Sequence, residues 1–148
     1  MSVVVLCDDV LAADSRAYGG SGNPSPGTKA KIHRLDDGRR VGIVSAKLGE
    51  PERFLSWLKA GDGPNAWVGD KPDLRAVVVM PTGEVFLHDD SIWPSGPISC
   101  DEFVVLGSGQ EYALGALHMG ATAAQAVEAA IRFDCNSGAP VRVLTREP

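Results

Sequence analysis

This sequence has no long apolar runs. None approaches the roughly 20 residues that a membrane-spanning helix needs, so we expect no membrane segment. The start of the chain also lacks a basic segment followed by an apolar one, which is the pattern of a signal peptide. These two absences predict a cytoplasmic protein.

Cysteine is scarce as well. The chain has three, Cys7, Cys100 and Cys135. They are too few and too irregularly spaced for a disulfide framework or a zinc site, and their scarcity fits a reducing compartment. We expect Cys7 and Cys135 to be small core residues. The histidines have no ligand spacing, so we predict no metal; they are His33, His88 and His118.

The sequence also has no excess of positively charged residues. The formal net charge is −5, and the lysines and arginines are scattered along the chain. This distribution argues against a nucleic-acid surface. The composition is otherwise that of a globular protein, because 44% of the 148 residues are hydrophobic. We expect residues 1–148 to form one domain with one core.

Apolar periodicity divides the chain into short strands and a few helices. The first sixteen residues should form two short apolar strands joined by a tight turn at Asp8-Asp9. The other segments expected to be strands pair as hairpins or end the chain: 29–35 with 41–44, 74–80 with 84–88, then 103–106 and 141–144. We expect helices near 50–60 and 110–119 and a third from about 122 to the break that begins at Asn136, with Thr122 and Gln125 forming a capping box. Segments 17–28 and 89–97 should be loops, because Gly, Ser and Pro dominate them. Strands and helices are segregated, which indicates an α+β protein with antiparallel sheets covered by helices.

Ser2 is the first candidate for chemistry. A small residue behind the initiator Met usually allows that Met to be removed. Ser2 would then carry a free amine and a hydroxyl, and an α-amine has a pKa of roughly 7.7 to 8.0. Nucleophile and base would belong to one residue. Ser at position 2 is common, however, so Ser2 alone is weak evidence.

Other polar residues have both a functional and a structural interpretation. Asp14 either holds a lysine charged or caps a turn, and Lys31 either stabilises a serine alkoxide or lies on the surface of a strand. Ser108 follows a glycine at a helix start, where it could be the N-cap. Asp134 and Ser137 could serve a site or cap a helix end.

Taken together, these residues resemble the proteasome β-subunit family of N-terminal nucleophile hydrolases. The resemblance rests on the order and spacing of several short motifs over nearly the whole chain: Ser2, Ala12-Ala13-Asp14-Ser15-Arg16, Lys31-Ile32, Val41-Gly42, Gly107-Ser108-Gly109, Tyr112 to Ala116, and Asp134-x-x-Ser137-Gly138. The bacterial relatives include the peptidase subunit of the two-component ATP-dependent protease, and the short phage and prophage members are the most similar.

The resemblance implies a role for each of these residues. Ser2 would be the nucleophile, where most members have Thr, and Asp14 and Lys31 would match the family's acid and lysine. Ser108, Asp134 and Ser137 would match the group that binds the terminal amine and hydroxyl. The family's oxyanion donor is the backbone N–H of a glycine. Here Ser45 or Ala46 takes that place, and a backbone donor survives a change of side chain.

The resemblance also implies a fold and an activity. The fold would be a four-layer αββα sandwich, and the activity would be hydrolysis of peptide bonds in peptides or unfolded proteins, with no cofactor. The protein would be a homo-oligomer, as a ring or a helical assembly, with an ATP-dependent unfoldase as a partner. Two alternatives remain open at this point. One is an inactive proteasome-like assembly subunit, and the other is an amidase acting on small amides.

Overall fold

The computed structural model describes residues 2–18, 24–99 and 103–146, and its main features are two packed sheets. The N-terminal sheet has the strand order β10-β1-β2-β11, with antiparallel neighbours throughout. Its strands are β1 (Val4–Cys7), β2 (Val10–Ala13), β10 (Phe103–Leu106) and β11 (Arg142–Leu144). This sheet therefore joins the first strands of the chain to its last strand.

The second sheet, which we call the central sheet, has the order β5-β6-β7-β8-β9 and is also antiparallel. Its strands are β5 (Ile32–Arg34), β6 (Arg40–Val44), β7 (Arg75–Val79), β8 (Val85–Asp89) and β9 (Ser95–Ile98). Separately, β3 (Arg16–Tyr18) pairs antiparallel with β4 (Pro24–Thr28).

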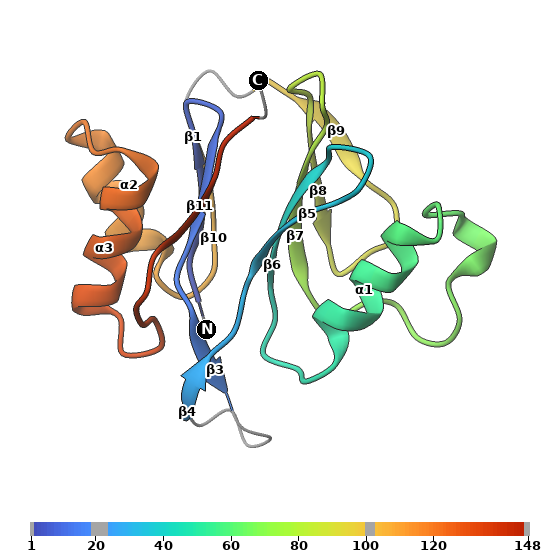
Figure 1. The fold of residues 1–148 in the computed structure, drawn as a ribbon, viewed down its shortest axis with the longest axis horizontal. Coiled ribbons are helices and arrows are strands. Elements are labelled where there is room, and N and C mark those ends of the chain that lie inside the picture. Colours follow the sequence, from blue (N-terminus) through green and yellow to red (C-terminus); the bar gives the residue numbers. More distant parts are fainter. Residues whose placement is uncertain (1, 19–23, 100–102, 147–148) are drawn as a thin grey trace.

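Helices cover the outer faces of both sheets (Figure 1). The helices α2 (Gln110–His118) and α3 (Ala123–Phe133) pack on the N-terminal sheet, and α1 (Glu50–Lys59) packs on the central sheet. A short 3-10 helix, η1 (Pro64–Ala66), follows α1. The layers are thus helix, sheet, sheet and helix, as the resemblance implied. None of the helices in the described ranges has the length and apolar character to cross a bilayer.

Alternation along β1 shows why the layers stack in this way. Val4 and Leu6 belong to the apolar cluster between the two sheets, whereas Val3 and Val5 belong to the cluster beneath α2 and α3. Successive side chains of a strand point to opposite faces, so one apolar segment supplies two interfaces. The strand is buried on both faces, which explains its nearly continuous run of valines.

Two predictions of local structure, a tight turn and a helix cap, agree with the structure because the residue types there determine the backbone conformation. Asp8 and Asp9 both have positive φ, 51° and 62°, which is the conformation of the two-residue type I′ turn between paired strands. Thr122 and Gln125 form the predicted capping box at the start of α3. The tight turn and this capping box are therefore confirmed.

Three predictions of local structure were wrong. Segment 17–28 was expected to be a loop, but it contains residues of β3 and β4. Residues 19–23 within it lie outside the described residues. Cys100 also lies outside the described residues. Segment 89–97 contributes residues to β9, which lies at the edge of its sheet. Pro97 is tolerated there because an edge strand has backbone N–H groups that need no sheet partner. Cys135 is exposed rather than a core residue.

The candidate residues all lie at one end of the sandwich. Ser2 precedes β1, Asp14 follows β2 and Ser108 follows β10. The register pairs Val4 with both Ala13 and Leu106, so the ends of these strands are adjacent. Antiparallel pairing therefore brings segments that are distant in sequence to the start of the chain.

Candidate active site

Backbone contacts on both sides hold Ser2 in place. Its carbonyl accepts a hydrogen bond from the Gly109 N–H at 3.1 Å, and its own N–H donates to Ser108 Oγ at 3.1 Å. The next residue, Val3, donates its N–H to Asp14 Oδ1 at 3.0 Å. Ser2 is only 3% exposed, so its hydroxyl has a defined environment rather than bulk water around it.

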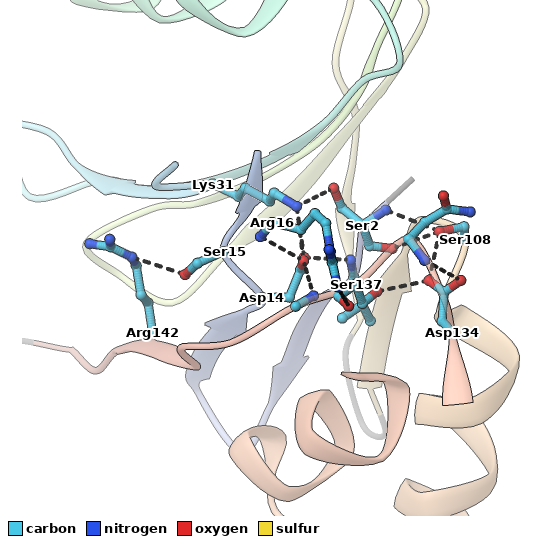
Figure 2. A network of polar contacts seen from close by, with 12 residues as sticks. Ser2, Asp14, Ser15, Arg16, Lys31, Ser108, Asp134, Ser137 and Arg142 are labelled. Carbon is cyan, nitrogen blue, oxygen red and sulfur yellow. Dashed lines mark hydrogen bonds and ion pairs between the residues drawn. The ribbon is translucent and has the colours of Figure 1, made fainter. Parts of the chain in front are cut away.

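A buried cation contacts the Ser2 hydroxyl directly (Figure 2). Lys31 Nζ lies 2.6 Å from Ser2 Oγ and 3.0 Å from each carboxylate oxygen of Asp14. The lysine is thus placed between the serine and the acid, at hydrogen-bond distance from both. The alternative that Lys31 is a surface residue of its strand is wrong, because the residue is 7% exposed.

Asp14 is fully buried, and its charge is well compensated. Besides Lys31, its carboxylate accepts hydrogen bonds from the backbone N–H groups of Val3, Arg16 and Gly138, at 3.0 to 3.1 Å. The hydrogen bond from the Arg16 N–H to Asp14 is the turn-capping contact that the structural interpretation of Asp14 predicted. Buried carboxylates need such donors because desolvation alone disfavours the charge. Asp14 therefore caps a turn and pairs with the lysine at once.

Burial dominates the electrostatics of Lys31. Desolvation lowers the pKa of Lys31 below its ordinary value, although the adjacent Asp14 carboxylate acts in the opposite direction. A cation in this position stabilises negative charge on Ser2 Oγ more strongly than it would in water, because the local dielectric is low. The Lys31 and Asp14 pair thus favours ionisation of the Ser2 hydroxyl.

A second polar cluster flanks the Ser2 nitrogen. Asp134 Oδ2 accepts hydrogen bonds from Ser108 Oγ and Ser137 Oγ, both at 2.8 Å. Burial raises the pKa of Asp134, but these hydroxyls and the Asn136 N–H outweigh it and hold that pKa below its ordinary value. The carboxylate orients Ser108, which in turn accepts the Ser2 N–H.

Ser108 is not the N-cap of α2. The N-cap is Gly109, and no side chain caps that end of the helix. The hydroxyl of Ser108 is instead engaged with Asp134 and Ser2, contacts that sequence spacing alone could not reveal. Asp134, in contrast, is the C-cap residue of α3 and also belongs to the cluster.

Ser45 and Ala46 lie immediately after β6 and line the pocket that contains Ser2. The Ser45 hydroxyl donates to the Asp73 carbonyl at 2.7 Å and accepts the Lys47 N–H at 3.0 Å, which gives this segment a defined shape. Among the described residues, none accepts a hydrogen bond from the Ala46 N–H. A backbone donor is therefore available beside Ser2.

Sequence reasoning missed Gly138 and Arg16 as parts of the site. A Cβ on Gly138 would lie 2.8 Å from Arg16 Nε, so a larger residue there would make the Arg16 side chain shift. Arg16 also reaches the Ser137 carbonyl at 3.3 Å. Both residues stand in the motifs Asp14-Ser15-Arg16 and Asp134-x-x-Ser137-Gly138. In those motifs the predicted roles were given to Asp14, Asp134 and Ser137 instead.

The described residues contain no cluster of three or more His, Cys, Asp or Glu side chains that could hold a metal ion. The site is built instead from one hydroxyl nucleophile candidate, a lysine, two carboxylates and backbone N–H groups. Such a set can move protons and stabilise an oxyanion.

Comparison with known structures identifies the fold. The eukaryotic HslV from Trypanosoma brucei superposes with a TM-score of 0.71 at 18% sequence identity, with 97% of each chain covered. The chain has the HslV fold. The Thiobacillus denitrificans BPH, solved in complex with epoxomicin, superposes with a TM-score of 0.62 at 21% identity, with both chains fully covered. No protein-family model and no curated protein matches the sequence.

The HslV likeness confirms the predicted α+β class and the four-layer αββα architecture. It covers nearly the full length of both chains. At these identities the likeness concerns the fold alone.

Proposed function

We propose that the protein is a peptidase of the proteasome β-subunit type that uses Ser2 as its nucleophile after removal of Met1. The observation that carries this proposal is the 2.6 Å contact between Lys31 Nζ and Ser2 Oγ, within a buried network anchored by Asp14. The HslV-like fold and the epoxomicin complex of a protein with the same fold support it. Residues 1–148 would act as one domain.

Removal of Met1 changes the chemistry of the Ser2 nitrogen. The amide becomes an amine with a pKa of roughly 7.7 to 8.0, so that part of it is unprotonated at neutral pH. This amine would remain near Ser108 Oγ and would take the proton from Ser2 Oγ, directly or through a water molecule. Lys31 would stabilise the alkoxide as it forms.

The reaction then follows the usual course of acyl transfer. Ser2 Oγ forms a bond to the substrate carbonyl carbon, and the backbone N–H of Ser45 or Ala46 stabilises the resulting oxyanion. The proton held by the amine passes to the leaving nitrogen as the peptide bond breaks. Water then attacks the acyl-enzyme, which releases the acid product and restores the Ser2 hydroxyl. None of these steps requires a cofactor.

The proposal includes substrates and partners. Substrates would be peptides or unfolded protein segments, and an ATP-dependent unfoldase would supply the latter, in the cytoplasm. The protein would form a homo-oligomer, either a ring or a helical assembly. The exposed aromatic rings of Tyr112 and Phe133 on the outer helices support an oligomer contact. Nucleic acid and membranes are not expected as partners.

One observation favours a second candidate function, an inactive assembly subunit. Ala46 adds a Cβ where the family's pattern has a glycine, next to the pocket that a substrate must enter. If this methyl group blocks the substrate, the polar network around Ser2 would serve only to hold the sheets together. An N-terminal amidase acting on small amides would tolerate the methyl group better, and substrate profiling distinguishes it from a peptidase.

The decisive experiment compares the wild-type protein with the Ser2→Ala variant. The intact mass should correspond to the chain without Met1, and fluorogenic peptides should be cleaved more than about a thousandfold faster by the wild type. Epoxomicin should add its mass to the wild type and not to the variant. Equal cleavage rates would remove Ser2 from the mechanism. A retained Met1 with no labelling by epoxomicin would favour the inactive subunit.

A further inference from the structure

The pocket that opens onto Ser2 has an unusual concentration of positive charge. Four of its lining residues are Arg16, Lys29, Lys31 and Lys47, and its described lining includes no Asp or Glu. The whole protein, in contrast, carries a net charge of −5. Positive charge is therefore gathered locally around the candidate nucleophile, against the balance of the chain as a whole.

Two of these four cations are paired with carboxylates that lie behind or beside the pocket. Lys31 pairs with Asp14 at 3.0 Å, and Lys29 pairs with Glu52 at 2.5 Å. The first pair is buried and belongs to the site already described. In the second, both side chains are about half exposed, so it lies at the rim and is screened by solvent.

Arg16 and Lys47 form no ion pair with a carboxylate of the described residues, although Lys47 lies close enough to Glu50 to help lower the pKa of that carboxyl. Arg16 donates to the Ser137 carbonyl, but its Nε atom is buried and has no hydrogen-bond partner in the described part of the chain. Lys47 lies on the exposed segment after Ser45 and is one of the residues that line the pocket. An anion entering the pocket would therefore meet two cations that are not held in ion pairs with the described residues.

The remaining lining residues limit the shape of the anion. Ala30, Ile43 and Pro51 give the pocket apolar surface beside the cations. A Glu side chain suits this combination, because its methylene groups can pack on apolar atoms while its carboxylate reaches the cations. The neighbouring pocket, which shares Ser45 and Ala46, is different, because its lining includes two carboxylates, Asp73 and Asp90, and one cation, Arg75.

We propose that this pocket selects an acidic side chain, Glu or Asp, on the residue whose carbonyl Ser2 attacks. The Cα of that residue is one bond from the attacked carbon, so its side chain must enter the pocket whose lining contains Ser2. The neighbouring pocket suits an acidic group less well, because its two carboxylates outnumber its one arginine. The inference rests on the proposed function of Ser2 and adds the class of substrate that the site prefers.

The preference is measured with fluorogenic peptides that differ only in the residue before the coumarin leaving group. We expect kcat/KM for Glu to exceed that for its neutral isostere Gln by about tenfold, because a partly desolvated charge pair distinguishes the two. The ratio should fall as salt is added, since screening weakens the attraction. A peptide with Leu at this position tests whether the apolar surface of the pocket determines the preference. A peptide with Arg tests whether the pocket prefers a basic side chain.

The Lys47→Gln variant tests the origin of the preference, and Lys71→Gln is its matched control. Lys71 is also an exposed lysine, but it is not part of the pocket lining. Lys47→Gln should lower the ratio of Glu to Gln cleavage about threefold to tenfold, whereas Lys71→Gln should leave it unchanged. The ratio is informative because a general loss of activity affects both peptides equally.

The outcomes separate this inference from the proposed function. Cleavage of Gln or Leu peptides at least as fast as Glu peptides overturns the acidic preference and leaves the role of Ser2 intact. If no peptide is cleaved and epoxomicin does not react, the proposed function fails. Binding then decides the preference: Ser2→Ala should bind an acetylated peptide ending in Glu amide about tenfold more tightly than the Gln peptide. Equal binding overturns the preference.

Discussion

At the scale of single residues, the site depends on two buried carboxylates and on the groups that donate hydrogen bonds to them. Asp14 is compensated by a lysine, whereas Asp134 is compensated by neutral donors, the hydroxyls of Ser108 and Ser137 and one backbone N–H. Hydrogen bonds to a carboxylate favour its ionised form even without an opposite charge. The orientation of Ser108 toward the Ser2 nitrogen therefore depends on ionised Asp134.

The Asp134 arrangement predicts a loss of stability in acid. The pKa of Asp134 is lower in the folded protein than its ordinary value, so its contribution is fully present above the unfolded pKa and is lost as pH falls through the folded one. Urea denaturation should therefore show a smaller decrease in the free energy of unfolding from pH 5 to pH 3 for Asp134→Asn than for wild type.

The control for Asp134→Asn is Asp89→Asn. Asp89 forms an exposed ion pair with Arg75, and its side chain is 65% exposed, so its removal should cost less than about 1 kcal/mol. At pH 7, Asp134→Asn itself should lower the free energy of unfolding by about 1 to 3 kcal/mol, because it weakens buried hydrogen bonds. An acid-pH profile of Asp134→Asn identical to wild type would contradict the assignment.

At the scale of elements, the site depends on how closely the turn after β10 approaches the start of β1. Gly107 has a φ of 104°, and a Cβ there would collide with the carbonyl group of Ser2. The same turn supplies Ser108 and the Gly109 N–H that bind Ser2. Glycine is therefore required both for the backbone conformation and for the space beside the candidate nucleophile.

Substitution of this glycine should damage both the fold and the activity. Gly107→Ala should lower the free energy of unfolding by about 2 kcal/mol or more and displace Ser2, so peptide cleavage should fall with it. The matched control is Gly63→Ala, at a position with a φ of −69° and nothing within 4 Å of the added Cβ. The control should gain up to about 1 kcal/mol. Wild-type activity in Gly107→Ala would contradict the close approach.

At the scale of the whole molecule, α2 and α3 form an outer layer on the N-terminal sheet (Figure 1), and this layer carries exposed apolar side chains. Phe133 is 66% exposed and Met119 is 84% exposed, and the ring of Phe133 lies 5.8 Å from that of Tyr112. Tyr112 and Met119 are seven residues apart on or just after α2, so they share one face. Such a face is typical of a contact between subunits.

The oligomer can be measured directly. Sedimentation velocity of the wild-type protein should give a species larger than the monomer, and Phe133→Ser should shift the population toward monomer by removing an exposed aromatic group from the contact. Val68→Ser is the control, because Val68 is 83% exposed but lies in the segment after η1 rather than on α2 or α3. A monomeric wild type at high concentration would refute this part of the proposal.

The sequence alone was informative wherever structure depends on neighbouring residues. The paired aspartates specified the turn between β1 and β2, and period-2 or helical spacing of apolar residues located most strands and helices. It failed at β4 and β9, because prolines and glycines there have a loop-like composition and the strands form only by pairing with neighbours. Predicted candidates such as Ser2, Asp14 and Lys31 came from a resemblance of motifs rather than from periodicity.

Only the tertiary structure decided what these residues contact. Ser2 meets Lys31 across 29 positions and Ser108 across 106, and these separations close because antiparallel strand ends and two packed sheets converge at one end of the sandwich. The backbone donors to Asp14, the space that Gly138 leaves for Arg16, and the charge of the pocket likewise arise from chain segments that carry no mutual signal in sequence. Local patterns encode the period of an element, whereas a site depends on long-range packing that places several elements together.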